Sequence, residues 1–83
     1  MLTMYGTPLC PDCVEAEAVL KAKKIPFDYV DITESTANLK AFLKLRDESP
    51  LFDEVKVAGG IGVPCFILPG GRMTLDVQEA LSL

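Results

Sequence analysis

The order of secondary-structure signals in the first 32 residues limits this chain to a small set of folds. Residues 2–5 form a short apolar run that ends at Gly6-Thr7-Pro8, which is typical of a buried strand followed by a loop. Pro11 favours the first turn of a helix, which we expect to run to about Lys23. Residues 27–32 then alternate like a second strand. A strand, a helix and a strand over this length predict parallel pairing through a right-handed crossover.

The middle of the chain predicts two further helical segments. Thr33 or Ser35 can cap a second helix, whose apolar side chains recur at the spacing of one helix face. These side chains are Leu39, Phe42 and Leu43, and we expect the stripe to pack on the sheet. Ser49-Pro50 resembles another cap and first-turn proline, so residues 51–57 predict a short extra turn of helix. Its inward-facing side chains are expected to be Leu51, Phe52 and Val55.

The last third of the chain predicts a β-hairpin followed by a helix. Residues 63–68 are an apolar run, Pro69-Gly70-Gly71 favours a tight turn, and residues 72–75 form a short fourth strand. Asp76 with Glu79 three residues later is typical of a capping box that opens a last helix. Its inward-facing side chains are expected to be Val77, Ala80 and Leu81. The predicted order is β-α-β-α-β-β-α, an α/β fold.

Size and charge exclude several classes of function. With 83 residues the chain has room for one small domain, which we expect to span residues 1–83 and to act as a monomer. A net charge of −4 and a pI near 4.6 argue against a nucleic-acid partner, which requires clustered lysine and arginine. No apolar run is long enough to span a membrane, and the first residues lack the features of a secretory signal. We therefore expect a cytoplasmic protein with no membrane partner.

The cysteines point to redox chemistry. The chain holds three cysteines and no histidine, so it can form neither a fully paired disulfide framework nor a closed four-ligand zinc site, and we expect no metal. Cys10 and Cys13 flank Pro11-Asp12 at a helix start, where free backbone N–H groups and the helix dipole favour a thiolate at Cys10. We expect Cys10 to be the nucleophile and Cys13, one turn later, to resolve the mixed disulfide.

The element order, the Cys10-Pro11-Asp12-Cys13 motif after the first strand, and Val63-Pro64 before the third strand together resemble the glutaredoxin branch of the thioredoxin-like superfamily. The resemblance implies a four-stranded mixed sheet in the order 2-1-3-4, with helices on both faces. It also implies that Pro64 is cis and lies beside the dithiol. Pro11, Asp12, Val63 and Pro64 would then contact the substrate.

The resemblance implies a thiol-disulfide oxidoreductase that reduces protein or low-molecular-weight disulfides without a bound cofactor. Glutathione or a thioredoxin reductase-like donor would be the reductant. Two departures weaken the expected glutathione contacts. The family usually has an aromatic residue in place of Asp12 and a lysine a few residues before Cys10, and its glycine pair before the last helix is replaced by Thr74-Leu75.

Several alternatives remain open at this point. The dithiol could serve a redox sensor or a partner-binding module without turnover, or Cys10 could ligate an iron–sulfur cluster in a glutathione-bridged dimer. The two cysteines could also be a chance pair of core residues. Asp12 could accept a proton or be a solvated helix-start residue. For Cys65 we expect an inert core thiol on the same strand face as Ile67, against the alternative of a third redox thiol.

Overall fold

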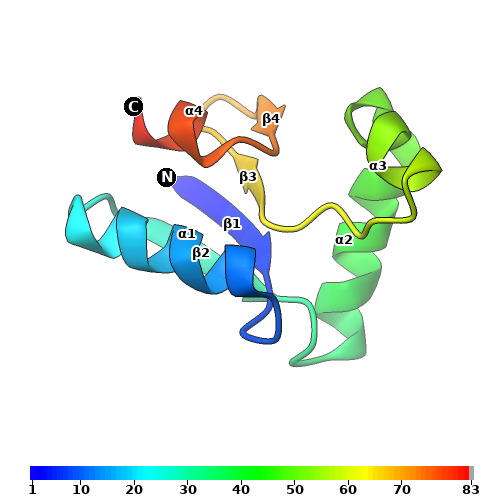
Figure 1. Cartoon of the computed structure of the whole chain (residues 1–83), viewed down its shortest axis with the longest axis horizontal. Helices are drawn as coiled ribbons and strands as arrows, with labels where there is room; N and C mark the ends of the chain where they lie inside the picture. The colour runs from blue at the N-terminus through cyan, green and yellow to red at the C-terminus, as the bar shows by residue number, and fades with distance from the viewer. Residues whose placement is uncertain (83) are drawn as a thin grey trace.

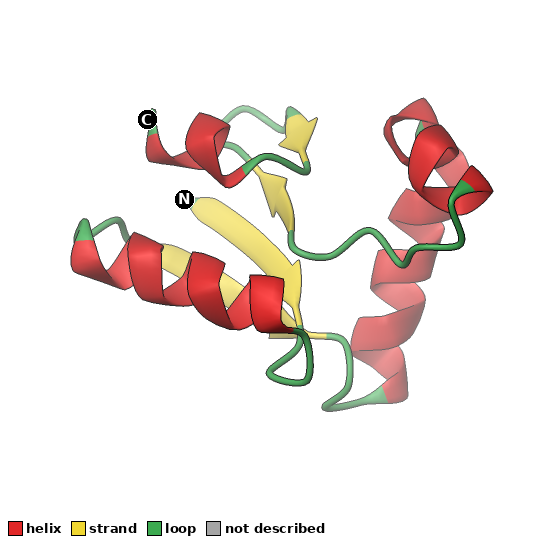
Figure 2. Ribbon diagram, in the orientation of Figure 1, coloured by secondary structure: helices red, strands yellow, loops and turns green. Residues whose placement is uncertain are grey.

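The computed structural model describes residues 1–82 and has the predicted order of helices and strands (Figures 1 and 2). The four strands are β1 (Leu2–Gly6), β2 (Phe27–Asp31), β3 (Cys65–Ile67) and β4 (Met73–Thr74). They form one mixed sheet in the order β2-β1-β3-β4. β1 pairs parallel with β2 and antiparallel with β3, which in turn pairs antiparallel with β4. This is a thioredoxin-like α/β fold, as expected.

Helices cover both faces of the sheet. They are α1 (Pro11–Ala22), α2 (Thr36–Glu48), the 3₁₀ turn η1 (Pro50–Phe52), α3 (Asp53–Val57) and α4 (Val77–Leu81). Because side chains alternate along a strand, β1 sends Leu2 and Met4 to the face covered by α1 and α4. Tyr5 packs on the opposite face, which is covered by α2 and η1. The sheet therefore separates two hydrophobic cores.

Helix α1 begins at Pro11, with Cys10 as its N-cap residue, and buries Cys13, Ala16 and Leu20 against the sheet. The helix ends at Ala22, and the expected last residue, Lys23, is its C-cap. Glu17 and Lys21 form the exposed i,i+4 ion pair that their spacing allows, at 3.5 Å.

The expected stripe on α2 is only partly covered. Ser35, the true N-cap, accepts a hydrogen bond from the Asn38 backbone N–H at 3.1 Å. Phe42 is fully buried, but Leu39 and Leu43 are 38% and 39% exposed, so the expectation that all three pack on the sheet is wrong. The sheet contacts one line of this helix, and Leu39 and Leu43 lie beside that line in an open hollow. They face solvent because no described element covers the hollow.

The segment after α2 also differs from its prediction at one residue. Ser49 caps the 3₁₀ turn by accepting a hydrogen bond from the Leu51 backbone N–H at 3.2 Å, and Phe52 is fully buried. Leu51 was expected to face inward, but it is 37% exposed. A 3₁₀ turn has about three residues per turn, so the neighbours Leu51 and Phe52 point in different directions and only one of them meets the core.

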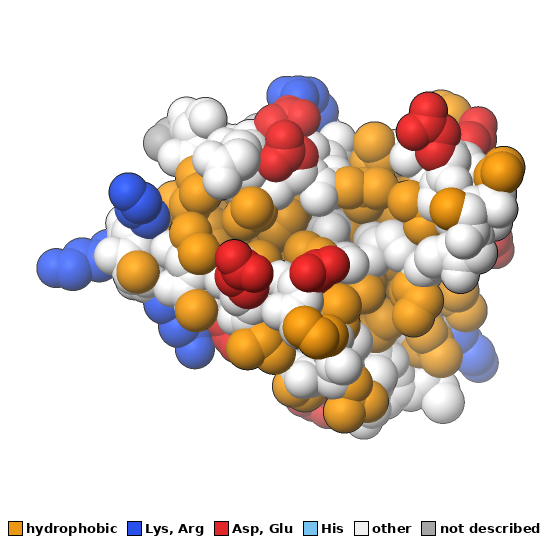
Figure 3. All heavy atoms as spheres, in the orientation of Figure 1, with side chains coloured by type: hydrophobic (Ala, Val, Ile, Leu, Met, Phe, Trp, Pro, Cys, Tyr) orange, Lys and Arg blue, Asp and Glu red, His pale blue; other side chains and the backbone are white. Residues whose placement is uncertain are grey.

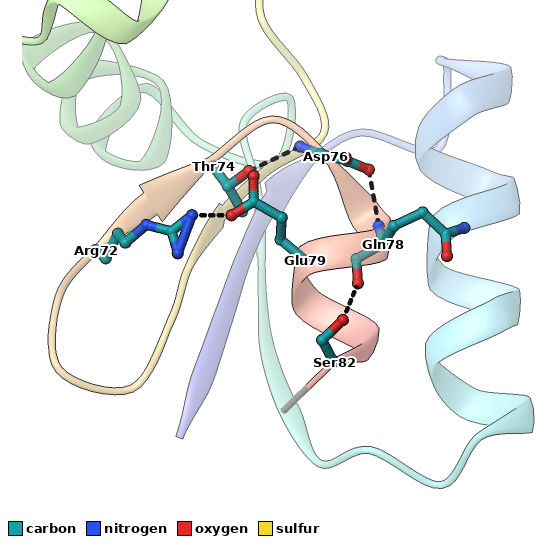
Figure 4. Close-up of polar contacts among 6 residues, drawn as sticks. All are labelled: Arg72, Thr74, Asp76, Gln78, Glu79 and Ser82. Atoms are coloured by element: carbon teal, nitrogen blue, oxygen red, sulfur yellow. Dashed lines mark hydrogen bonds and ion pairs between the residues drawn. The ribbon is translucent and has the colours of Figure 1, made fainter.

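The hairpin and α4 form with shorter strands than expected, and the capping box is absent (Figure 4). Asp76 caps α4 by accepting a hydrogen bond from the Gln78 backbone N–H at 2.9 Å. A capping box would require Glu79 to accept the Asp76 backbone N–H, but that group donates to the Thr74 hydroxyl at 3.1 Å. Glu79 pairs with Arg72 instead. The predicted box is therefore wrong because Thr74 already satisfies the donor.

Within residues 1–82, no helix is both long and apolar enough to cross a bilayer.

Candidate functional site

Cys10 lies at the amino end of α1, at the edge of the molecular surface. Its backbone is extended, with φ −105° and ψ 120°, and its side chain is partly exposed. The Cys10 carbonyl accepts hydrogen bonds from the N–H groups of Cys13 and Val14, both at 3.1 Å. These bonds start the helix while the Cys10 side chain stays outside the first turn. The Cys10 thiol can therefore meet a partner and still lie beside the positive end of the helix.

Cys13 lies beneath Cys10 and is completely buried. The pKa of the Cys13 thiol is raised to about 11, first by burial and then by the hydrogen bond and the charge of the neighbouring Cys10 sulfur. A hydrogen bond from the Thr7 backbone acts in the opposite direction on the same pKa. The two sulfurs are therefore in contact but differ in access, since only Cys10 reaches solvent.

Gly6 provides the space for the buried thiol. A Cβ atom at Gly6 would lie 3.1 Å from the Cys13 Sγ and 3.2 Å from the Tyr29 hydroxyl, closer than ordinary packing contacts. The Tyr29 pKa is raised to about 12, first by burial and then by the nearby Cys13 sulfur. Sequence reasoning placed Gly6 in a loop and gave Tyr29 no role. A glycine at a strand end is a known signal of close approach, whereas the approach of Tyr29 has no local signal.

Thr7, also missed from the sequence, anchors the loop that leads to Cys10. Thr7 is 5% exposed, and its hydroxyl hydrogen-bonds to that of Thr33 at 3.0 Å. The same hydroxyl accepts the Leu9 backbone N–H at 3.1 Å, and the Thr7 carbonyl accepts the Cys10 N–H at 3.2 Å. These hydrogen bonds tie the loop between β1 and α1 to the segment that follows β2. They therefore fix the position of the two thiols relative to the sheet.

The Val63–Pro64 peptide bond is cis, as the resemblance implied. Val63 packs against both cores, and Cys10 contacts the α1 core that Val63 also touches. Pro64 lines a groove of about 340 Å³ between α1 and α4 together with Asp12, so these two predicted site residues share one surface. Pro11 is the exposed first residue of α1. The groove is lined by Asp12, Glu15, Ala16, Val19, Pro64, Leu75, Asp76, Val77 and Gln78.

Cys65 lies on the other face of the sheet. It is completely buried beside Ile32, Phe42 and Phe52, and burial raises its pKa to about 11. Its neighbour Phe66 points into the α1 core, so the predicted strand alternation is confirmed. The sheet lies between Cys65 and the Cys10–Cys13 pair, which supports the inert reading of this thiol.

A larger, almost wholly apolar hollow of about 720 Å³ lies on the α2 face. Its lining includes Leu39, Leu43 and Ile61, together with part of Phe42, and contains no cysteine. Its larger volume does not make this hollow the candidate redox site, because the Cys10 and Cys13 thiols lie at the amino end of α1.

Comparisons with known proteins agree with this architecture. The sequence profile of the glutaredoxin family matches residues 2–67. An uncharacterized protein of Haemophilus influenzae is 40% identical over 76 residues, which cover 92% of this chain and 88% of that relative. No solved structure matches the chain. From the match over most of its length, together with its fold, the chain belongs to the glutaredoxin family.

Proposed function

We propose that the protein is a dithiol disulfide reductase that works through Cys10 and Cys13. One observation carries the proposal: an accessible thiol at a helix N-cap lies in contact with a second thiol that is completely buried. Reactive cysteines lie in partly exposed, electropositive surroundings, and a helix amino end provides them. Family membership supports the same general redox role.

The reaction has two exchange steps. The Cys10 thiolate attacks one sulfur of a substrate disulfide, forms a mixed disulfide, and releases the first substrate thiolate. Cys13 then loses its proton and attacks the Cys10 sulfur, which forms the intramolecular disulfide and releases the second thiolate. Both thiolates take protons from solvent. The substrate gains two electrons, and the protein dithiol is oxidised.

The burial and the raised pKa of Cys13 support the proposed order of attack. Cys13 is completely buried and, with a pKa of about 11, protonated at neutral pH, so a substrate disulfide meets Cys10 first. Its contact with Cys10 gives the resolving step the advantage of an intramolecular reaction once the mixed disulfide has formed. Asp12, Pro11, Val63 and Pro64 are proposed to form the surrounding substrate surface.

Substitution of each thiol tests this proposal. Cys10→Ser should abolish disulfide reduction, since no accessible thiol remains, whereas Cys13→Ser should accumulate a mixed disulfide at Cys10. Intact-mass spectrometry after incubation with a neutral disulfide measures both results. Cys65→Ala is the matched control and should keep the reductase rate within about twofold, because Cys65 faces the other core. Alkylation of Cys13 before Cys10 at neutral pH would reverse the assigned roles.

We further propose that glutathione is a weak partner and that the protein acts in the cytoplasm. Thr74-Leu75 stands where the family has its glycine pair, and no lysine lies in the loop before Cys10. We expect slow turnover of a glutathione mixed disulfide without saturation at low glutathione concentration. A coupled assay with glutathione reductase, run beside one with thioredoxin reductase, measures the two donors. Saturation at low glutathione, at the rates of dithiol glutaredoxins, would contradict this prediction.

A further inference from the structure

The groove between α1 and α4, which is lined by Asp12 from the segment between the two cysteines, carries charge of one sign. Three of the side chains that line it are carboxylates, namely Asp12 and Glu15 on α1 and Asp76 at the start of α4. All three residues are exposed, and no lysine or arginine within residues 1–82 lines the groove. Figure 3 shows acidic side chains over α1 and near α4, while blue side chains gather beyond the end of α1 and at the periphery. The groove therefore presents negative charge beside an exposed apolar surface.

The basic residue nearest to α4 in sequence is directed elsewhere. Arg72 pairs with Glu79, and in Figure 4 this pair lies on the side of α4 away from α1, whereas Gln78 lies on the side facing α1. Glu79 is free for this pair because the Thr74 hydroxyl accepts the Asp76 N–H. The hydrogen bond from the Asp76 N–H to Thr74 thus leaves Glu79 to pair with Arg72, and this ion pair holds the arginine charge outside the groove.

We infer that the groove selects disulfides with a positively charged group next to the sulfur–sulfur bond, an inference that rests on the proposed function of the dithiol. The chemical class is a cationic disulfide, either an aminothiol disulfide or a cystine flanked by lysine or arginine. Such a substrate brings its charge towards three carboxylates, whereas an anionic disulfide is repelled. The exchange steps are those already given, with the cationic disulfide as oxidant.

The size of the effect follows from exposed charges. A unit charge 4–8 Å from an exposed carboxylate in salt-containing water changes a rate by about 1.7-fold, and the effect decays over a Debye length. Three carboxylates should together favour a cation over a neutral substrate by about fivefold at low salt. The preference should shrink towards unity in about 0.5 M salt.

Single-turnover kinetics of the reduced protein test the inference with three probes: cystamine, which is dicationic, bis(2-hydroxyethyl) disulfide, which is neutral, and 3,3′-dithiodipropionate, which is dianionic. Each rate is divided by that of dithiothreitol with the same probe, which removes differences in intrinsic reactivity. We expect cystamine to be fastest and the dianion slowest. Equal normalised rates, with the neutral probe reacting, would overturn this inference alone. No reaction with the neutral probe would contradict the proposed function itself.

A charge-neutralised variant assigns the preference to the groove. In Asp12→Asn/Glu15→Gln/Asp76→Asn the ratio of the cystamine rate to the neutral-probe rate should fall about fivefold; asparagine at residue 76 keeps a good N-cap. Glu48→Gln/Asp53→Asn/Glu54→Gln makes the same change in net charge on α2 and α3, far along the chain from the groove, and should keep the ratio. Equal falls in both variants would show a general effect of net charge and would overturn the assignment to the groove.

Peptide probes separate the two sources of cationic disulfide. Two disulfide-linked peptides are compared that differ only in lysine or glutamate beside the cysteines. A lysine preference larger than the cystamine preference identifies a polypeptide as the substrate. A smaller lysine preference identifies an aminothiol disulfide. Equal rates for the two peptides together with equal rates for the small probes would reject the inference.

Discussion

The two faces of the sheet each bury a cysteine, yet only one face has the arrangement of a redox site. Cys13 and Cys65 are both completely inaccessible, and burial raises the pKa of each to about 11. The difference is a neighbour: Cys13 contacts Cys10, which reaches the surface, whereas Cys65 is enclosed with Ile32 and aromatic rings. Burial therefore does not distinguish a working thiol from a packing thiol. Contact with an accessible sulfur is the feature that distinguishes the redox-site thiol from the packing thiol.

The two cores are also built differently. On the α1 face eight buried residues share the packing, and two of them, Ala16 and Ala80, have small side chains. On the α2 face the described residues form a hydrophobic cluster of four buried side chains, and two phenylalanines provide most of its volume. Phe42 and Phe52 meet edge to face, with ring centroids 5.9 Å apart. Stability on this face should depend on few side chains, and three predictions test that.

The largest expected effect is on Phe42. Phe42→Ala should lower the free energy of unfolding by about 4 kcal/mol, because it removes a fully buried ring and leaves a cavity. Its neighbour Leu43, 39% exposed in the same helix, is the control, and Leu43→Ala should cost less than about 1 kcal/mol. Urea denaturation followed by circular dichroism measures both variants. Where Phe42→Ala does not fold, Phe42→Leu should still cost more than Leu43→Ala; similar losses for the two sites would contradict the picture of a core dominated by two rings.

A smaller effect is expected at Gly62. Gly62 has φ +99°, and a Cβ there would lie 2.7 Å from a ring carbon of Phe52. Gly70 has the same φ with open space around it, so Gly70→Ala carries only the backbone cost of a positive φ, about 1–2 kcal/mol. Gly62→Ala adds overpacking and should cost about 2 kcal/mol more. The comparison uses thermal and urea unfolding. Equal losses in the two variants would mean that the Phe52 ring moves aside freely.

The smallest effect is at Cys65, and it should change sign with pH. Cys65→Ala should cost about 1 kcal/mol at neutral pH as a core truncation. In the wild type the unfolded thiol loses its proton near its ordinary pKa of 9.0, while the folded thiol holds it until about 11. The folded state then binds more protons, so wild-type stability falls as pH rises from 9 to 11, by about 2 kcal/mol for this group. The variant lacks this loss.

The Cys65→Ala variant should therefore match or exceed the wild type in stability near pH 11. Cys13, Tyr29 and the lysines titrate in both proteins, so their contributions cancel in the difference. Unfolding curves measured at pH 7.5, 9, 10 and 11 under reducing conditions test the crossing. A stability difference that stays constant across this range would show that Cys65 does not keep its proton on folding.

Local sequence signals predicted much of the site but not its environment. The helix start at Pro11 and the alternation of Cys65 and Phe66 were correct, since each depends on the chain's own periodicity. The cis bond at Pro64 and the strand order came from the family resemblance and are confirmed. The approach of Tyr29 to Cys13 was missed because it joins residues from separate elements.

The same distinction separates what sequence and tertiary structure each decided about this protein. The positions of Cys10 and Cys13 around Pro11 by themselves placed one thiol at the cap of a helix and the other in its first turn, because proline favours the first helical position. Only the tertiary structure decided that Cys13 is the buried partner, since its neighbours include Gly6 of β1, Tyr29 of β2 and the Thr7 backbone. Only the tertiary structure turned Arg72 away from the acidic groove. Periodicity sets the direction of a side chain from its own backbone, whereas burial and electrostatic environment depend on elements distant in the chain.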